Sequence, residues 1–209
     1  MTKNIIYILA ALAGTGLIIY GALFYTKTGP KEAGILPPIV SNEFEEPILG
    51  DPNAPVTMIE YGSYLCGHCV NFTRYNMPQI EENYIRTNKV KFIYRSYPPI
   101  ELGMAILCAN EQNKFWSYHN YIIEKGIKSE EDLKQYATEI GLKGDQFNQC
   151  LDSEKYKQKA ENWYKLGQEQ GVEGTPTFFI NDQKIVGNLA YEEFKKVIEE
   201  ELAKSKMTD

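Results

Sequence analysis

The chain has 209 residues, of which 43% are hydrophobic and 24% are charged, a balance that can bury a sizeable core and argues against wholesale disorder. Its 22 lysine and arginine residues stand against 28 aspartate and glutamate residues, a net charge of −6, which argues against nonspecific binding of nucleic acid through a basic surface. Four cysteines are too few for a disulfide-rich scaffold, but two of them form a C-x-x-C motif.

The N-terminal segment is predicted to be a transmembrane helix. No charged residue lies between Lys3 and Lys27, and as a helix residues 4–26 would span about 35 Å, enough to cross a bilayer core. The alternative is a signal peptide cleaved near Ala11-Leu12-Ala13, although cleavage there leaves a very short apolar core. We expect an uncleaved anchor, followed by a linker over residues 27–46, whose prolines favour extended chain.

The rest of the sequence alternates between strand and helix patterns. Strands are expected where short, apolar, β-rich runs occur, at residues 56–61, 90–94, 177–180 and 184–186. Helices are expected over longer stretches, at residues 66–86, 101–125, 129–140, 145–170 and from 191 onward. Pro78 is expected to kink the first helix, and Ser129 with Asp132 can cap the third.

This order of elements predicts an α/β fold. A strand–helix–strand unit implies a parallel pair of strands, and the two late strands form an antiparallel hairpin. The helical block of about residues 100–170 between these two parts is predicted to be an insertion into the α/β domain.

The motif Cys66-Gly67-His68-Cys69 follows a predicted strand and opens a predicted helix. Cysteines three residues apart on a first helical turn lie on one face and can form a disulfide bond. The free amides of the helix N-terminus favour an anion, so Cys66 is predicted to have a low pKa, and a protonated His68 would lower it further. Because a stable thiolate is a good leaving group, the pair is predicted to be an oxidising, easily reduced disulfide.

Other uses of a C-x-x-C motif fit the sequence less well. Structural zinc needs four clustered ligands, and the other two cysteines lie far along the chain. A c-type haem site needs histidine directly after the second cysteine, where Val70 stands. An inert disulfide within one helical turn would close almost no loop and stabilise little. We therefore expect redox chemistry with no metal and no cofactor, and keep metal binding by Cys66, His68 and Cys69 as an alternative.

Three stretches of the chain, in order, resemble the DsbA-type thiol–disulfide oxidoreductases. They are Ile48-Leu49-Gly50-Asp51-Pro52 through Tyr61 leading into the motif, Lys114-Phe115-Trp116-Ser117-Tyr118-His119, and Gly171-Val172-Glu173-Gly174-Thr175-Pro176-Thr177-Phe178. The resemblance covers a domain of residues 47–204. It implies a thioredoxin fold with an all-helical insertion, an extracytoplasmic location, and insertion of disulfides into exported proteins. Two positions depart from the family pattern: Gly67-His68 replaces the frequent Pro-His, which weakens any claim of strong oxidising power, and Ser63 stands where an acidic residue is common.

The resemblance also assigns roles to residues outside the motif. Thr175-Pro176 resembles the cis-proline loop, which packs against the cysteines and offers backbone groups to an extended substrate. Glu60 matches a glutamate proposed in the family to relay a proton to or from Cys69. The alternative for Glu60 is a strand-end residue paired with a base such as Arg95. His119 is expected to be a packing residue.

Cys108 and Cys150 both fall in the helical block, and in an oxidising compartment such a pair is expected to form a structural disulfide, with two buried free thiols as the alternative. We thus predict an enzyme that inserts disulfides into reduced exported polypeptides. Its domain is expected on the extracytoplasmic side of the cell membrane, and the resemblance implies re-oxidation by a quinone-linked membrane partner of the DsbB or VKOR type. The alternatives are a membrane-tethered reductase or isomerase and a metal-binding chaperone module.

Overall fold

A five-stranded mixed sheet with strand order β1-β3-β2-β4-β5 forms the centre of the computed structural model, which describes residues 46–206. Its strands are β1 (Ile48–Leu49), β2 (Val56–Gly62), β3 (Val90–Ser96), β4 (Thr177–Ile180) and β5 (Gln183–Val186). As predicted, β2 and β3 are parallel and β4 and β5 are antiparallel. The short strand β1, which pairs antiparallel with β3, was not predicted. The predicted anchor at residues 4–26 lies outside the described residues.

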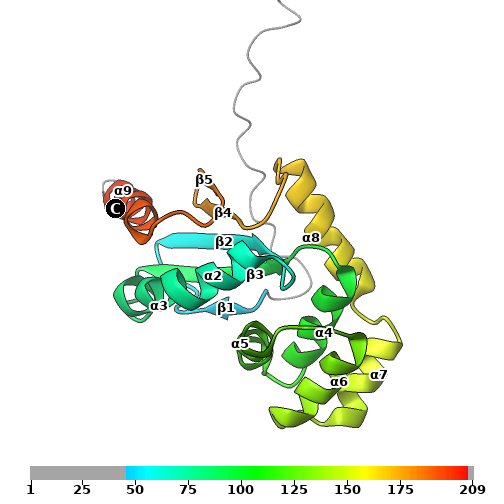
Figure 1. The fold of residues 1–209 in the computed structure, drawn as a ribbon. Coiled ribbons are helices and arrows are strands. Elements are labelled where there is room, and N and C mark those ends of the chain that lie inside the picture. Colours follow the sequence, from blue (N-terminus) through cyan, green and yellow to red (C-terminus); the bar gives the residue numbers. More distant parts are fainter. Residues whose placement is uncertain (1–45, 207–209) are drawn as a thin grey trace, which may run out of the picture. The chain divides into compact units, whose positions relative to one another are not determined.

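The helices follow the predicted order along the chain (Figure 1). They are α2 (Gly67–Asn71), the π-helical turn η1 (Phe72–Asn76), α3 (Met77–Ile80), the π-helical turn η2 (Glu81–Ile85), α4 (Ile100–Asn110), α5 (Phe115–Lys125), α6 (Glu130–Glu139), α7 (Gly144–Asp152), α8 (Lys157–Glu169) and α9 (Tyr191–Ser205). The stretch Gly67–Ile85 is called the active-site helix below, and α4–α8 the helical insertion.

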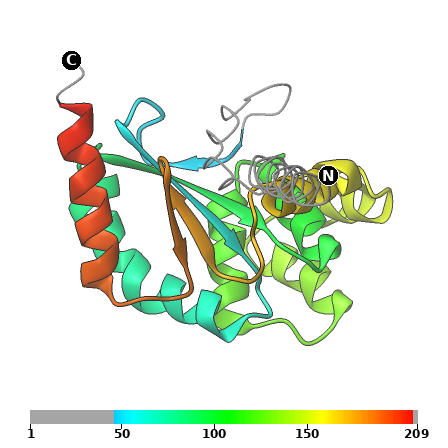
Figure 2. The same cartoon turned by 90° about the horizontal axis from the view of Figure 1, so that it is seen from above.

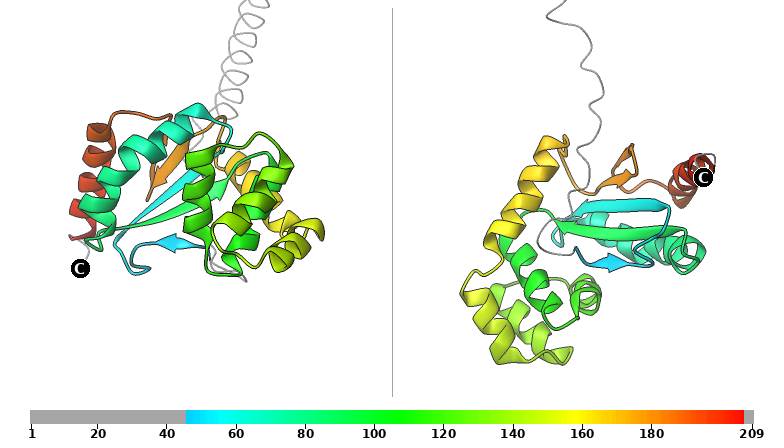
Figure 3. Two further views of the ribbon diagram at one scale, coloured as in Figure 1. Left: turned by 60° about the horizontal axis from the view of Figure 1, so that its bottom comes forward. Right: turned by 180° about the vertical axis from the view of Figure 1, so that it is seen from behind.

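Helices cover both faces of the sheet. The active-site helix crosses the sheet between α9 on one side and the helical insertion on the other (Figures 2 and 3). On this face the rings of Phe72, Phe178 and Phe194 join the active-site helix, β4 and α9, with centroids 4.4–5.2 Å apart. On the opposite face α8 packs closely, because a side chain at Gly167 would meet the Tyr61 ring. The sheet is therefore buried on both faces, as its nearly continuous apolar strands require.

Two predicted helices are each broken in the structure. The predicted helix 101–125 ends at Asn110 and restarts at Phe115, and the predicted helix 145–170 is interrupted between Asp152 and Lys157. At each break a residue other than glycine adopts a left-handed backbone, Asn113 with φ 58° and Glu154 with φ 52°. Such a residue ends the helical hydrogen-bond ladder and lets the chain turn back, so that the separate helices pack on one another.

The active-site helix passes through Pro78 as a continuous helical stretch. The π-helical turn η1 ends at Asn76, directly before the α3 segment that contains Pro78 near its start. Proline lacks an N–H and its ring crowds the preceding turn, and π-helical turns lie on both sides of the α3 segment that contains it. The capping box predicted at Ser129 and Asp132 is present at the start of α6.

The last residue of the predicted linker is bound into the folded domain. The Glu46 carboxylate accepts two hydrogen bonds from the Arg95 guanidinium, at 2.8 and 2.9 Å, and a third from the Trp163 indole at 3.1 Å. Arg95 is 3% exposed and also donates to the Tyr61 hydroxyl at 2.6 Å. Because a buried guanidinium needs a paired anion, Glu46 belongs to the domain rather than to a solvated spacer.

Candidate active site

The C-x-x-C motif lies where β2 leads into the active-site helix. Cys66 is the N-cap residue of α2, with an extended backbone of φ −93° and ψ 114°, and Gly67 is the first helical residue. Cys66 is partly exposed, whereas Cys69, one helical turn later, is only 1% exposed. The two sulfurs are free thiols in this structure. An attacking thiol from outside therefore reaches Cys66 and not Cys69.

The environment of Cys66 favours its thiolate. Burial opposes ionisation, but hydrogen bonding by the Thr175 side chain and by the amide of Cys69 outweighs it, so the pKa of Cys66 is lowered from its ordinary value. The thiol of Cys69 and the amide of His68 act in the same direction. His68 itself is exposed, so in this structure it contributes to the site through its backbone. These amides belong to the first helical turn, where they have no partner within the helix.

Cys69 has the opposite character. Burial, followed by the nearby Glu60 carboxylate, raises the pKa of the Cys69 thiol far above its ordinary value. The Ser63 N–H donates a hydrogen bond to the Cys69 sulfur at 3.4 Å and partly offsets this effect. One cysteine of the motif thus ionises more readily than an ordinary cysteine, and the other less readily.

The loop at Thr175-Pro176 lies directly beside the motif, and its peptide bond is cis. Strand β4, which begins at Thr177, pairs with β2, with Thr177 opposite Tyr61. This pairing brings Thr175 next to a cysteine 109 residues earlier, and the Cys66 thiol donates to the Thr175 carbonyl oxygen at 3.2 Å. A second cis peptide bond, which the sequence reasoning missed, joins Pro98 and Pro99.

Glu60 is buried in β2, at 1% exposure, and neither of its carboxylate oxygens has a hydrogen-bond partner. Burial, with a smaller contribution from Cys66, raises the pKa of Glu60 well above its ordinary value. The alternative of an ion pair with Arg95 is wrong, because Arg95 binds Glu46. Gly62 leaves room for the carboxyl group, since a Cβ there would lie 2.6 Å from Glu60 Oε1. Glu60 is therefore a buried acid beside both cysteines.

Two further residues lie at the site: Tyr64 was not singled out from the sequence, and His119 was expected only to be a packing residue. Tyr64, in the loop before the motif, shares a hydrogen bond of 3.0 Å with Nδ1 of His119 on α5. Both side chains are buried, and burial lowers the pKa of His119 to about 3, so the imidazole is neutral. Nothing in the local sequence indicates this contact, because the partners lie 55 positions apart on different elements.

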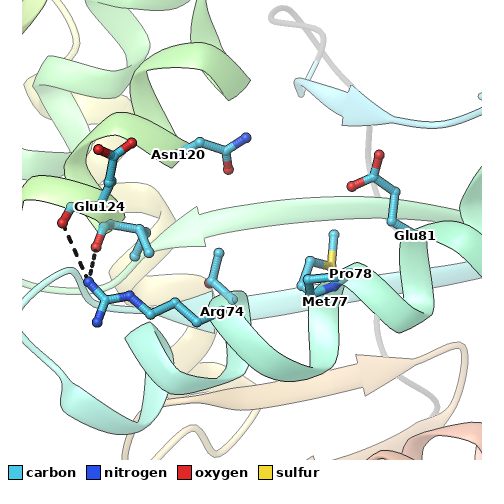
Figure 4. A pocket seen from close by; sticks show the side chains of 8 residues that line it. Arg74, Met77, Pro78, Glu81, Asn120 and Glu124 are labelled. Atoms are coloured by element: carbon cyan, nitrogen blue, oxygen red, sulfur yellow. Dashed lines mark hydrogen bonds between the residues drawn. The ribbon is translucent and has the colours of Figure 1, made fainter.

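One set of contacts joins the helical insertion to the active-site helix, and a disulfide bond crosslinks the insertion internally. The Arg74 guanidinium reaches from the active-site helix to the end of α5, where it donates to the carbonyl oxygens of Ile123 at 2.9 Å and Glu124 at 3.4 Å (Figure 4). These residues border a surface pocket of about 300 Å³ between the two helices. Within the insertion, Cys108 of α4 and Cys150 of α7 form a disulfide bond.

The predicted site residues are therefore found together, except for the His68 side chain, which is exposed, and the pair Cys108 and Cys150. Cys66, Cys69, Glu60, Thr175 and Pro176 meet at one end of the sheet, whereas Cys108 and Cys150 form a separate crosslink in the insertion. Within residues 46–206 no group of three or more His, Cys, Asp or Glu side chains is arranged to hold a metal ion. In the same range, no helix has both the length and the apolar character needed to cross a membrane.

The fold and the site together define a thioredoxin-fold protein with a dithiol pair and a helical insertion. The family model described as "Thioredoxin" matches residues 42–200. "Disulfide bond formation protein D" of Bacillus subtilis is 32% identical over 174 residues, which cover 75% of this chain and 77% of that protein. The oxidised crystal structure of BdbD from Bacillus subtilis has a TM-score of 0.70 and 28% identity, covering 76% of this chain and 93% of that one.

A second solved structure, Wolbachia pipientis α-DsbA1, also has a TM-score of 0.70, with 29% identity over 78% of this chain and 94% of that one. The chain belongs to the thioredoxin family, within its DsbA-like disulfide oxidoreductases. It is a thiol–disulfide oxidoreductase.

Proposed function

We propose that this protein inserts disulfide bonds into exported proteins by exchange at Cys66 and Cys69. The observation that carries the proposal is the contrast between the two sulfurs: Cys66 is partly exposed with a lowered pKa, and Cys69 is buried with a raised pKa. Stabilising the Cys66 thiolate stabilises the reduced protein, which makes its disulfide a stronger oxidant. The same contrast selects Cys66 as the sulfur that substrates attack.

The reaction starts from the Cys66–Cys69 disulfide. A substrate thiolate attacks the Cys66 sulfur, so that a mixed disulfide forms, the Cys66–Cys69 bond breaks, and Cys69 leaves with the electron pair. A second substrate thiolate then attacks the substrate sulfur of the mixed disulfide and releases Cys66 as a thiolate. The substrate loses two electrons and two protons, of which one proton is retained on Cys69 and the other passes to solvent.

Glu60 is proposed to supply the proton that Cys69 takes up. The pKa of Glu60 is raised by burial, so its carboxyl group holds a proton at pH values where an exposed glutamate would not. Burial, and next the charge of Glu60, also raise the pKa of the departing Cys69 sulfur, so this sulfur readily takes up a proton. In the reverse step, when the dithiol is re-oxidised, the Glu60 carboxylate accepts the proton from Cys69.

Thr175 and Pro176 are proposed to bind the substrate backbone beside Cys66. An extended peptide placed along this loop would pair with it as an added strand, using backbone groups of Thr175. The Thr175 carbonyl already lies 3.2 Å from the Cys66 sulfur, so a peptide bound there would bring its own cysteine to the reacting atom. Recognition through backbone atoms suits an enzyme that acts on many unfolded chains.

The location and the partner are part of the same proposal. The uncharged segment at residues 4–26 supports a membrane anchor, with the domain on the extracytoplasmic side, where disulfides persist. Electrons taken from substrates must leave the reduced pair, and we propose a quinone-linked membrane protein of the DsbB or VKOR type as the re-oxidant. An anchor shared with that partner's membrane would raise the frequency of their encounters.

The equilibrium of the Cys66–Cys69 pair with glutathione tests the direction of electron flow. We expect a reduction potential well above the value of about −270 mV typical of thioredoxin, together with net transfer of a disulfide to a reduced, unfolded polypeptide. A potential near that of thioredoxin would instead favour a tethered reductase. Location is tested in whole cells: a membrane-impermeant maleimide should label Cys66 of the full chain, and the protein should sediment with membranes.

A further inference from the structure

We propose that the backbone amide of Ser63 stabilises the Cys69 sulfur as it leaves, and that Tyr64 and His119 are positioning residues that hold this amide in place. The inference rests on the proposed function, because it concerns the step in which the Cys66–Cys69 bond breaks. It assigns a role to the loop before the motif and to a histidine of the helical insertion.

The leaving sulfur needs a donor because it departs into a buried site. Cys69 is 1% exposed, so little water can solvate the negative charge that develops on its sulfur. The Ser63 N–H already points at that sulfur, at 3.4 Å. The neighbouring Glu60 does not attract the charge unless it is protonated. The fixed amide is therefore a donor that can respond to the developing charge at once, before the proton of Glu60 has been transferred.

The contribution of this amide differs between the ground state and the transition state. A disulfide sulfur is a weak acceptor, whereas a sulfur that carries negative charge accepts a much stronger, charge-assisted hydrogen bond. The Ser63–Cys69 bond therefore strengthens as the disulfide breaks. An interaction that is stronger in the transition state than in the ground state accelerates the reaction.

Besides local hydrogen bonds such as that from the Cys66 N–H to the Ser63 carbonyl at 3.0 Å, three hydrogen bonds join the loop that carries this amide to segments distant in the sequence. The Gly62 carbonyl accepts from the Tyr97 N–H at 2.6 Å, and the Ser63 hydroxyl donates to the Pro98 carbonyl at 3.0 Å. The third is the bond of 3.0 Å between the Tyr64 hydroxyl and His119 Nδ1. This bond ties the loop to the helical insertion, and Tyr64 directly follows Ser63, whose amide faces the Cys69 sulfur.

His119 is well placed to be a rigid anchor. Its ring is 3% exposed and lies against Tyr94, Tyr64 and Trp116, with centroids 4.5, 5.4 and 5.6 Å away. These aromatic contacts fix the direction of Nδ1. The insertion also stays attached without this bond, because Arg74 binds the carbonyl oxygens at the end of α5 (Figure 4). Removing the Tyr64 hydroxyl should therefore loosen the loop without detaching the insertion.

The test is the rate at which dithiothreitol reduces the Cys66–Cys69 disulfide of the full chain in detergent. We expect Tyr64→Phe to slow this reaction about tenfold, less than the loss seen when a comparable donor is removed outright. The equilibrium constant with glutathione should stay within about twofold, because the bond acts mainly in the transition state. Tyr118→Phe is the matched control: it removes a buried hydroxyl that donates to the Leu133 carbonyl at 2.7 Å, and should react like the wild type.

A second pair of variants guards against misfolding. His119→Asn retains a polar atom near the position of Nδ1 and should keep most of the rate, whereas His119→Leu should match Tyr64→Phe. Wild-type rates in Tyr64→Phe and His119→Leu would overturn the proposal. Equal changes in the reduction rate and in the equilibrium constant with glutathione would also overturn it, because they would indicate a ground-state effect. A wild-type potential near that of thioredoxin would refute the proposed direction of function and leave these rate comparisons intact.

Discussion

Replacing Glu60 with glutamine should remove a loss of stability that the wild-type protein shows as the pH rises above the ordinary pKa of glutamate. The folded state holds the Glu60 proton more tightly than the unfolded chain does, because burial raises its pKa well above the ordinary value of 4.5. Above that value the unfolded chain releases the proton while the folded protein retains it, so stability falls as pH rises. The loss continues until the pH reaches the raised pKa of the folded state.

The size of the effect follows from one proton. Between the two pKa values the free energy of unfolding should fall by about 1.4 kcal/mol for each pH unit because of Glu60 alone. Glutamine carries no such proton, so the Glu60→Gln protein lacks this slope. The variant's unpaired amide adds an offset that does not depend on pH, so the slope, and not the value at one pH, is the quantity to compare.

Equilibrium urea unfolding of the oxidised protein measures this difference, because the motif cysteines do not titrate while they are bonded. The stability difference, Glu60→Gln minus wild type, should increase with pH from about pH 4.5 upward.

Glu111→Gln is the control of opposite sign. Burial works to raise the pKa of Glu111, but the hydrogen bond and charge of Lys155 outweigh it and lower the pKa. That variant should lose stability relative to wild type as pH rises through the acidic range. Parallel curves for wild type and Glu60→Gln would refute a buried, protonated Glu60.

Two further predictions concern the cysteines. In the reduced protein iodoacetamide should modify Cys66 before Cys69, with a pH midpoint below the ordinary value of about 8.5, and preferential modification of Cys69 would contradict the assignment. Replacing Cys108 and Cys150 with alanine removes a crosslink across 42 positions. The chain-entropy relation gives a loss of about 4 kcal/mol, or roughly 8–16 °C in Tm. Reducing the Cys108–Cys150 bond in a Cys66→Ala/Cys69→Ala protein removes the crosslink but keeps both side chains, so it separates crosslinking from packing. An unchanged Tm after this reduction would refute the estimate.

The sequence was sufficient to predict the main architecture. The alternation of strand and helix patterns predicted the parallel pair β2–β3 and the hairpin β4–β5 because those strands are apolar and bounded by turn residues. It missed β1, since a pair of residues is too short to show any periodicity. It also joined α4 to α5 and α7 to α8, because the breaks lie at Asn113 and Glu154 and carry neither glycine nor proline.

The site was predictable to the extent that it is local in the sequence. The position of Cys66 at a helix start follows from the strand that precedes it and the helix that follows. The partners of Arg95 and Tyr64 were not predictable, because Glu46 and His119 reach them from other elements. A histidine on an apolar helix face looks like a packing residue from sequence alone, and only its contact with the loop before the motif reveals more.

The order of the strands has a consequence for the nascent chain. Strand β2 lies between β3 and β4, and β4 is formed by residues 177–180, so the neighbour that carries the Thr175-Pro176 loop is synthesised last. Cys66, Cys69, Cys108 and Cys150 all emerge before it does. Until then Cys66 lacks the hydrogen bonding by Thr175 that contributes to its lowered pKa, and all four cysteines are already part of the chain. Correct pairing therefore has to compete with early mispairing while the chain is being synthesised, and a premature stop before residue 177 would leave all four thiols without a finished site.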